Sequence, residues 1–297
     1  INRVPYPLPP IPAPAWTMLP TRAAMERLIA AARRAYRTEA AILAVAGAQA
    51  AIQMIPRLSP PGHARVLGPT YNEHAGALRA AGWAVDEVSA PDALAGADLA
   101  VVVNPNNPDG RVLLPEALGA IARRVGRLVV DESFADATPE VSMAGGALAP
   151  GTLVLRSFGK FYGLAGLRLG FVLGSAPDIA QLADMGGPWP VGGAAIEVGA
   201  AALADRAWAH LTRERLSVEA RQLDELAARA GWRSIGGTTL FRLYGTANAS
   251  VAQERLARAR IWSRVFPYSG TRLRLGLPGG EEEWDRLSAA LTRATFA

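Results

Sequence analysis

Lys160 is the first residue of this chain that suggests chemistry, because it is the only lysine among 31 basic side chains. Arginine stays protonated and is a poor nucleophile, whereas a desolvated lysine amine loses its proton and forms a Schiff base with a carbonyl. A compositional drift from lysine to arginine that spared one position predicts a catalytic amine there. The alternative is a surface lysine that survived by chance.

The residues around Lys160 suit an anionic ligand. Residues 157–160 read Ser-Phe-Gly-Lys, and Arg168 follows eight positions after the lysine. The hydroxyl of Ser157 and the guanidinium of Arg168 match the acceptors of a phosphate, and the small residues between them let the backbone approach a ligand closely. A glycine-rich turn between strands is the alternative, but Ser-x-x-Lys with a following arginine is more specific than such a turn.

Three further motifs follow apolar segments. Asp131 ends the run 128–131, where a carboxylate is poorly solvated and needs a cation or hydrogen bonds. Residues 104–110 contain two Asn-Pro pairs, which fix a turn and direct amide side chains across the strand ends. Residues 47–49, Gly-Ala-Gln, open a helix whose backbone N–H groups suit a phosphate. Alone, each motif is equally consistent with a capping acid, a plain turn or an ordinary strand-to-helix junction.

The elements that carry these motifs alternate along residues 42–174. Continuous apolar runs are typical of strands buried on both faces of a sheet. The predicted strands are 42–46, 65–68, 84–88, 99–103, 128–131, 153–156 and 169–173. Helices are expected at 48–57, 72–82 and 115–125. This alternation predicts a three-layer α/β/α domain with a mixed, mostly parallel seven-stranded sheet, with ligands at the carboxyl ends of the strands.

The remaining segments predict a second, smaller domain. Residues 1–20 are proline-rich and read as an extended arm, and a helix is expected at 21–37. Residues 175–192 read as a domain junction, and residues 193–230 as helical. Beyond them we expect strands near 239–243 and 272–275, and helices at 251–260 and from 281. We therefore predict a large domain at 21–190, and a small α+β domain at 191–297 joined by the arm 1–20.

Composition excludes several classes of protein. No apolar run reaches the ~18 residues of a membrane helix, and no secretory leader is apparent. The net charge is +5, but the arginines are scattered among acids, which argues against a nucleic-acid-binding surface. The chain has no cysteine, which excludes disulfides and thiolate chemistry and fits a cytoplasmic protein. We predict no metal site.

These motifs, in this order, resemble the fold-type I pyridoxal-phosphate (PLP) enzymes, in the branch that contains histidinol-phosphate aminotransferase. The resemblance runs over almost the whole chain, and it implies that Lys160 binds PLP as a Schiff base and that Asp131 keeps the pyridinium nitrogen protonated. It also implies that Asn107 bonds the ring O3′ and that Tyr71 stacks on the ring. The cofactor phosphate would be held by Gly47, Ala48, Gln49, Ser157 and Arg168.

The resemblance also assigns the substrate side of the site. Arg274 matches the small-domain arginine that binds the substrate carboxylate, and Arg272, two residues away on the same strand face, is the second choice. Asn2 stands in a matching Ile-Asn position and is the candidate for the substrate phosphate. A homodimer is expected, because this family builds its active sites at a subunit interface.

Within this branch, residues 1–2, 46–50, 67–74 and 274–279 are similar to the threonine-phosphate decarboxylases of cobalamin biosynthesis. These enzymes convert L-threonine O-3-phosphate into (R)-1-aminopropan-2-yl phosphate and CO2. Two departures from the aminotransferase pattern agree: Phe134 replaces a tyrosine, and Leu19 replaces the tyrosine of a Tyr-Pro pair. The alternatives are an aminotransferase of the histidinol-phosphate type and a PLP-binding domain without activity. The bond that breaks depends on how the substrate is oriented, which the residues do not reveal.

Overall fold

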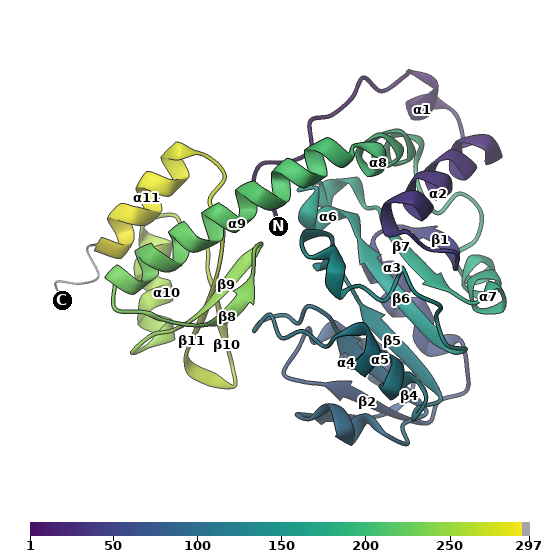
Figure 1. Ribbon diagram of the computed structural model, residues 1–297, viewed down its shortest axis with the longest axis horizontal. Coiled ribbons are helices and arrows are strands. Elements are labelled where there is room, and N and C mark those ends of the chain that lie inside the picture. Colours follow the sequence, from purple (N-terminus) through teal and green to yellow (C-terminus); the bar gives the residue numbers. More distant parts are fainter. Residues whose placement is uncertain (293–297) are drawn as a thin grey trace.

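The computed structural model describes residues 1–292 and shows a large α/β part joined to a smaller α+β part (Figure 1). A seven-stranded sheet forms the centre of the large part, in the order β1-β7-β6-β5-β4-β2-β3. Its strands are β1 (Ala41–Val45), β2 (His63–Leu67), β3 (Ala84–Val88), β4 (Leu99–Val103), β5 (Arg127–Asp131), β6 (Thr152–Ser157) and β7 (Gly170–Gly174). Every strand predicted for this region is present.

The sheet is mixed because one strand runs against its neighbours. β7 pairs antiparallel with β1 and with β6, whereas β3, β2, β4, β5 and β6 are parallel to one another. All five residues of β4 are buried, as expected for a strand covered on both faces. The predicted mixed, mostly parallel sheet is therefore confirmed.

Helices cover both faces of this sheet, and alternate residues of β4 show the two layers. Val101 packs in one apolar cluster with residues of α3, α4 and α7, and Val102 packs in the other with residues of α2, α5 and α8. These helices are α2 (Arg22–Tyr36), α3 (Ala48–Met54), α4 (Glu73–Ala80), α5 (Pro115–Ala122), α7 (Ala176–Gly186) and α8 (Gly193–Ala204). The three-layer architecture is thus confirmed. Short 3-10 turns lie at η1 (Ile55–Arg57), η2 (Pro91–Leu94), η3 (Ala135–Ala137), η4 (Pro139–Val141) and η5 (Ala165–Leu167).

The small part is an antiparallel sheet with helices on one side. Its strands, in the order β10-β11-β9-β8, are β8 (Arg233–Thr238), β9 (Phe241–Gly245), β10 (Arg264–Phe266) and β11 (Ser269–Gly276). α10 (Ala249–Arg258) and α11 (Glu281–Thr292) pack with it. The 24-residue helix α9 (Arg206–Arg229) runs from the large part into the small part (Figure 1).

Three helical segments form where none was expected: α6 (Phe158–Phe161), a single turn after β6, and two helices with a proline in the first turn. The arm contains α1 (Pro14–Thr17), because Pro14 at the first helical position loses no hydrogen bond there. The expected junction 175–192 contains α7, whose start is capped by the Ser175 hydroxyl and tolerates Pro177 in its first turn. The last two errors came from treating proline as a helix breaker at positions where it begins a helix.

Two strands escaped prediction. β8 contains Gly236 and Gly237, which lack the side chains that signal a strand, and β10 has only three residues. The division into domains at residue 190 stays a prediction; α8, just beyond it, packs along α2 of the large part. The last five residues of the predicted range 191–297 lie outside the described residues. Within residues 1–292, no helix has the length and apolarity that a membrane span requires.

Candidate active site

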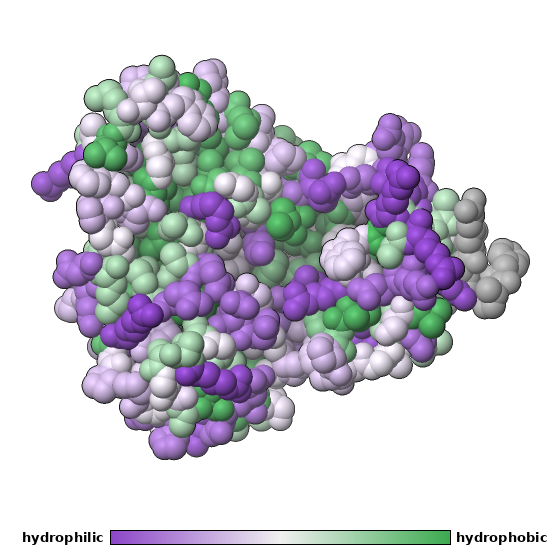
Figure 2. Space-filling model, turned by 180° about the vertical axis from the view of Figure 1, so that it is seen from behind, coloured by the Kyte–Doolittle hydropathy of each residue, from purple (hydrophilic) through white to green (hydrophobic). Residues whose placement is uncertain are grey.

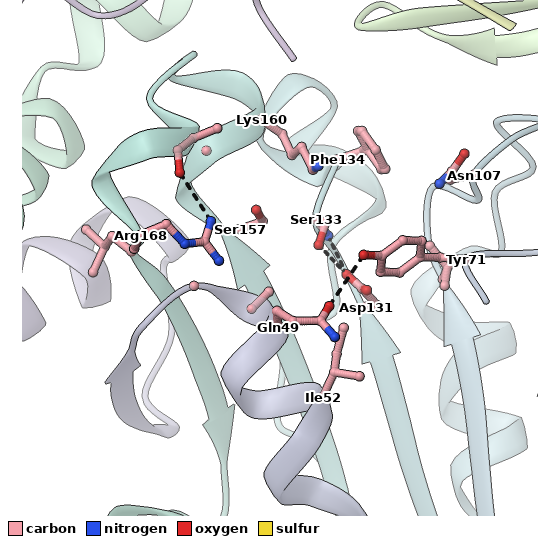
Figure 3. A pocket seen from close by; sticks show the side chains of 16 residues that line it. Gln49, Ile52, Tyr71, Asn107, Asp131, Ser133, Phe134, Ser157, Lys160 and Arg168 are labelled. Carbon is pink, nitrogen blue, oxygen red and sulfur yellow. Dashed lines mark hydrogen bonds between the residues drawn. The ribbon is translucent and has the colours of Figure 1, made fainter. Parts of the chain in front are cut away.

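A pocket lies at the carboxyl ends of β4, β5 and β6 (Figure 3). It faces the small part, and from behind the surface is hollowed where the two parts meet (Figure 2). Parallel strands bring their carboxyl ends to one edge of a sheet, so motifs far apart in the chain converge there. The nine residues predicted to bind the cofactor all line this pocket: Gly47, Ala48, Gln49, Tyr71, Asn107, Asp131, Ser157, Lys160 and Arg168. Their individual roles stay predictions.

Lys160 lies on α6 (Phe158–Phe161), a single helical turn that follows β6. Burial lowers the pKa of its amine, the charges of Arg274 and Arg168 lower it further, and Asp131 partly offsets them. The amine nitrogen is 5.8 Å from the centre of the Phe134 ring. A lysine amine with a lowered pKa is uncharged in a larger fraction of molecules near neutral pH, which is the form that attacks a carbonyl.

Asp131 is held ionised by two neighbours. Its carboxylate accepts hydrogen bonds from the Ser133 backbone and hydroxyl, and it lies 2.8 Å from His74 Nε2, which must donate because an ionised carboxylate only accepts. Burial alone would raise the pKa of Asp131, but the bonds and charge of His74 and Ser133 hold it below its usual value. Asp131 therefore keeps a negative charge inside the pocket.

His74 was missed from the sequence as a functional residue. It lies in the first turn of α4, three residues after Tyr71, and is 4 % exposed. This spacing puts its ring beside that of Tyr71, at 6.2 Å between centroids. A histidine at the start of a helix carries no chemical signal alone, so only the i, i+3 relation to the predicted ring-stacking Tyr71 could have identified it.

Arg168 crosses the start of α3 because glycine stands at residue 47. A Cβ on Gly47 would lie 2.6 Å from Arg168 Nη2, and the backbone of Gly47 has φ +79°. Arg168 itself has φ 52°, a left-handed conformation that is costly for a residue with a Cβ. Its side chain points towards Ser157 along the same side of the pocket (Figure 3). The backbone thus holds a guanidinium and a hydroxyl on one wall.

The opposite wall consists of Tyr71 and Asn107. The Tyr71 hydroxyl donates to Gln49 Oε1 at 3.4 Å, which fixes the ring along the pocket. Asn107 accepts a hydrogen bond from Arg274 of β11. Of the three asparagines in residues 104–110, only Asn107 lines the pocket, because Asn104 and Asn106 bond neighbouring backbone instead.

The arginines of the small sheet differ in position. Arg274 is largely buried, and burial together with the charge of Arg264 lowers the pKa of its guanidinium to about 10. Arg264 of β10 stands directly opposite Arg274 in the strand register. None of Arg264, Arg272 and Arg274 lines the pocket itself. Arg274 reaches it through its bond to the lining residue Asn107, and Arg264 is the strand neighbour of Arg274, whereas the structure shows no such link for Arg272, the predicted second choice. The sequence could not identify Arg264, because its proximity to Arg274 depends on the pairing of β10 with β11.

Asn2 lies outside the pocket, and protein partners occupy both ends of its amide. Nδ2 donates to the Phe161 carbonyl at 2.9 Å, and Oδ1 accepts from Val4 N at 3.0 Å and from Arg215 at 2.8 Å. The side chain is 2 % exposed. The predicted role of Asn2 in holding a substrate phosphate stays a prediction, and these contacts do not support it.

The two departures from the aminotransferase pattern occupy different places. Phe134 lines the pocket and packs edge-on against Phe241 of β9, with 4.9 Å between ring centres. No hydroxyl is therefore present beside Lys160 at this position. Leu19 is 63 % exposed on the N-terminal arm and does not line the pocket.

Comparisons with known proteins agree with this geometry. The family model of the aminotransferases of class I and II matches residues 18–295. The chain is 46 % identical to a threonine-phosphate decarboxylase of Pseudomonas aeruginosa, over 97 % of this chain and 88 % of that protein. A threonine-phosphate decarboxylase of a Sinorhizobium species is also 46 % identical, over 99 % and 90 %. A histidinol-phosphate aminotransferase of Mycobacterium tuberculosis is 37 % identical, over 88 % and 75 %.

Solved structures show the same fold at low sequence identity. Histidinol-phosphate aminotransferase of Sinorhizobium meliloti, in complex with pyridoxal-5'-phosphate, has a TM-score of 0.82 at 20 % identity, over 96 % of this chain and 88 % of that one. L-threonine-O-3-phosphate decarboxylase of Porphyromonas gingivalis has a TM-score of 0.79 at 21 % identity, over 94 % and 93 %. These likenesses establish the fold of the chain.

Proposed function

The chain belongs to the aminotransferase class I and II family, and we propose that within it the protein is a PLP-dependent decarboxylase of L-threonine O-3-phosphate. The product would be (R)-1-aminopropan-2-yl phosphate, in cobalamin biosynthesis. The two relatives at 46 % identity carry this name, whereas the aminotransferases are more distant.

The donor set of the pocket fits PLP. The pocket holds one amine, one buried ionised carboxylate, and a wall made of a hydroxyl and a guanidinium. We assign Lys160 to the aldehyde carbon, Asp131 to the pyridinium nitrogen, and Ser157 and Arg168 to the phosphate. Asn107 would bond O3′ and Tyr71 would cover the ring face. The close approach of Gly47 to Arg168 supports the phosphate assignment, because it brings the guanidinium beside the backbone amides at the start of α3, where both can bind the same anion.

Bound PLP supplies an electron sink for the charge that develops at the substrate Cα. Asp131 contributes by keeping the ring nitrogen protonated, and His74 contributes by keeping Asp131 ionised. Lys160 is the proton carrier, and its lowered pKa makes release of the proton from the amine easier than from an ordinary lysine. Phe134 places a ring without a hydroxyl 5.8 Å from this amine, so no side-chain hydroxyl at this position bonds Lys160.

The surroundings of Arg274 support an anionic substrate. The guanidinium is largely buried, faces the like charge of Arg264, and has no carboxylate partner among residues 1–292. Like charges directly opposite each other in a sheet are destabilising, so an anion between them would relieve their repulsion. Threonine phosphate offers two anionic groups, a carboxylate and a phosphate, at opposite ends of a short chain. We assign its anions to Arg274 and Arg264, and we give Arg272 no direct contact.

One incubation tests this proposal. Protein loaded with PLP and supplied with threonine phosphate, but with no oxo-acid, should release CO2 and form aminopropanol phosphate, both measurable by mass spectrometry. An aminotransferase needs an oxo-acid to complete its cycle. In a parallel incubation that contains 2-oxoglutarate, transfer of the amino group to it without CO2 release would show that the protein is an aminotransferase.

We further propose that the protein is a homodimer. Among the large apolar side chains that are at least half exposed, four lie on two segments of the large part and its arm: Trp16, Met18, Leu19 and Trp189. Exposed apolar side chains of this size are typical of subunit interfaces. Light scattering coupled to size exclusion should give twice the mass of the chain, 31.2 kDa. A monomer at micromolar concentration would contradict the proposal. Location in the cytoplasm stays a prediction from the sequence.

A further inference from the structure

The N-terminal arm lies against the helical turn that carries Lys160. Three successive carbonyls of this turn accept backbone or side-chain bonds from the arm: Lys160 O from Asn2 N, Phe161 O from Asn2 Nδ2, and Tyr162 O from Tyr6 N, each at 2.9 Å. The last carbonyls of a helix have no partner within the helix. In a helix of four residues this concerns almost every carbonyl, so the arm replaces the turns that α6 lacks.

The contact is close enough to fix the position of α6. A Cβ on Gly163 would lie 2.7 Å from Asn2 O and 2.8 Å from Pro5 Cα. Tyr6, on the same arm, stacks edge-on against Trp208 at 5.1 Å and hydrogen-bonds Asp205. The arm can therefore shift only if α6 or the start of α9 shifts with it.

Asn2 is itself fixed from the side of α9. Arg215 donates to Asn2 Oδ1 at 2.8 Å and is held by both carboxylate oxygens of Glu219, at 2.8 Å and 2.7 Å. The next residue, Arg3, pairs with Glu283 of α11, which also accepts from Gly279 N at 2.8 Å. The arm thus connects the turn of Lys160 with the long helix α9 and with the small part. In Figure 1 the N-terminus accordingly lies between α6 and α9.

We propose that Asn2 is a positioning residue for Lys160, holding two successive carbonyls of α6 while Arg215 fixes its amide. This proposal depends on the catalytic role of Lys160 given above. Asn2 acts through α6 and touches neither cofactor nor substrate. It also replaces the idea that Asn2 binds the substrate phosphate, because every polar atom of its side chain already has a partner.

The test uses the single lysine. Lysine labelled with 13C at Cε gives one lysine resonance in this chain, so its titration reports Lys160 alone, before and after PLP is added. Asn2→Leu keeps the approximate size of the side chain and adds no charge, but it loses the donor to Phe161 O and the acceptor for Arg215 and Val4. We expect the pKa of Lys160 to rise towards its ordinary value as burial loosens, and kcat to fall roughly 10- to 100-fold with KM within about 2-fold. The charged groups that act on Lys160, which are Asp131, Arg168 and Arg274, stay the same in this variant.

Two comparisons make the result decisive. Asn248→Leu is the same change at an exposed helix cap of the small part, and it should leave both the pKa of Lys160 and kcat unchanged. Arg215→Met removes the anchor of Asn2 without altering the arm, so it should also raise the pKa of Lys160, even if Asn2→Leu folds poorly. An unchanged pKa of Lys160 in both Asn2→Leu and Arg215→Met would overturn the proposal. A rise in KM at unchanged kcat in Asn2→Leu would also overturn it, because it would indicate that Asn2 contacts the substrate. The resonance is independent of the reaction, so it decides this proposal even if no CO2 is released.

Discussion

Replacing Gly47 with alanine should separate cofactor binding from folding. Gly47 has φ +79° and ψ 157°, a region that is open almost only to glycine. The strain of placing alanine there costs about 1–3 kcal/mol of the free energy of unfolding. Gly96, on an exposed turn, also has a positive φ, +80°, and a Cβ added there would have no atom within 4 Å, so Gly96→Ala adds backbone strain without a clash.

The two variants differ in what the new methyl group meets. At residue 47 it would lie 2.6 Å from Arg168 Nη2, so the guanidinium must leave its place at the start of α3. A hydrogen bond to a charged group contributes about 1.5–3 kcal/mol. Since about 1.4 kcal/mol is a factor of ten in affinity, loss of the Arg168 contact should weaken PLP binding by roughly 10- to 150-fold. Gly96→Ala should not change that affinity.

The assay is a titration of cofactor-free protein with PLP, followed by the visible absorbance that develops when PLP binds, together with thermal unfolding of the same samples. Both variants should unfold at a lower temperature than the wild type. Only Gly47→Ala should need more PLP for half saturation. Wild-type PLP affinity in Gly47→Ala would refute the argument that Arg168 holds the cofactor phosphate across Gly47.

Other residues give shorter predictions. Lys160→Ala should abolish the visible absorbance of the PLP complex, because no other side-chain amine exists on the chain; a band that persists in this variant would remove Lys160 from the mechanism. His74→Leu removes the bond and charge that hold the pKa of Asp131 down, so burial should raise that pKa and move the acid limb of the kcat profile to higher pH. In the wild type, ionised Asp131 stabilises the folded state above the ordinary carboxyl pKa, and this contribution is lost as the pH falls through the lowered pKa. The same variant should therefore lose less stability on acidification than the wild type, and parallel pH profiles of kcat and of stability would contradict both effects. Arg264→Gln should raise KM for threonine phosphate by roughly 10-fold or more, whereas Arg272→Gln should leave KM within about 2-fold, in the same steady-state assay.

Most of the large sheet could be predicted because its central strands, β4 to β7, are buried on both faces. Runs such as Leu99–Val103 are apolar throughout, and that signal is local. β8 gave no such signal, because Gly236 and Gly237 lie close against the backbone of Asp109 and of β9, where side chains have no room. The close backbone contacts require glycine at these positions, and glycine has no side chain that would indicate a strand in the sequence.

The pocket residues could likewise be identified from short motifs in the sequence, but the residues that support them could not. Asp131 was identifiable from the strand that it ends, whereas His74, which keeps it ionised, is 57 residues away in the chain. Arg264 becomes important only through the pairing of β10 with β11. A sequence shows the groups that carry out chemistry more readily than the groups that tune and position them, because tuning depends on tertiary contacts.

Arg274 illustrates why the two parts of the molecule must act together. Its guanidinium bonds Asn107 of the pocket while its strand belongs to the small sheet, and the loop of Asn107 is tied to that sheet again by the bond from Gly237 N to Asp109 O at 2.8 Å. A guanidinium has five donors in a fixed fork, so Arg274 can retain Asn107 and still grip an anion. A substrate anion at Arg274 would therefore hold the small part against the loop that we assign to the cofactor ring. Substrate binding and cofactor orientation would then be linked through one side chain.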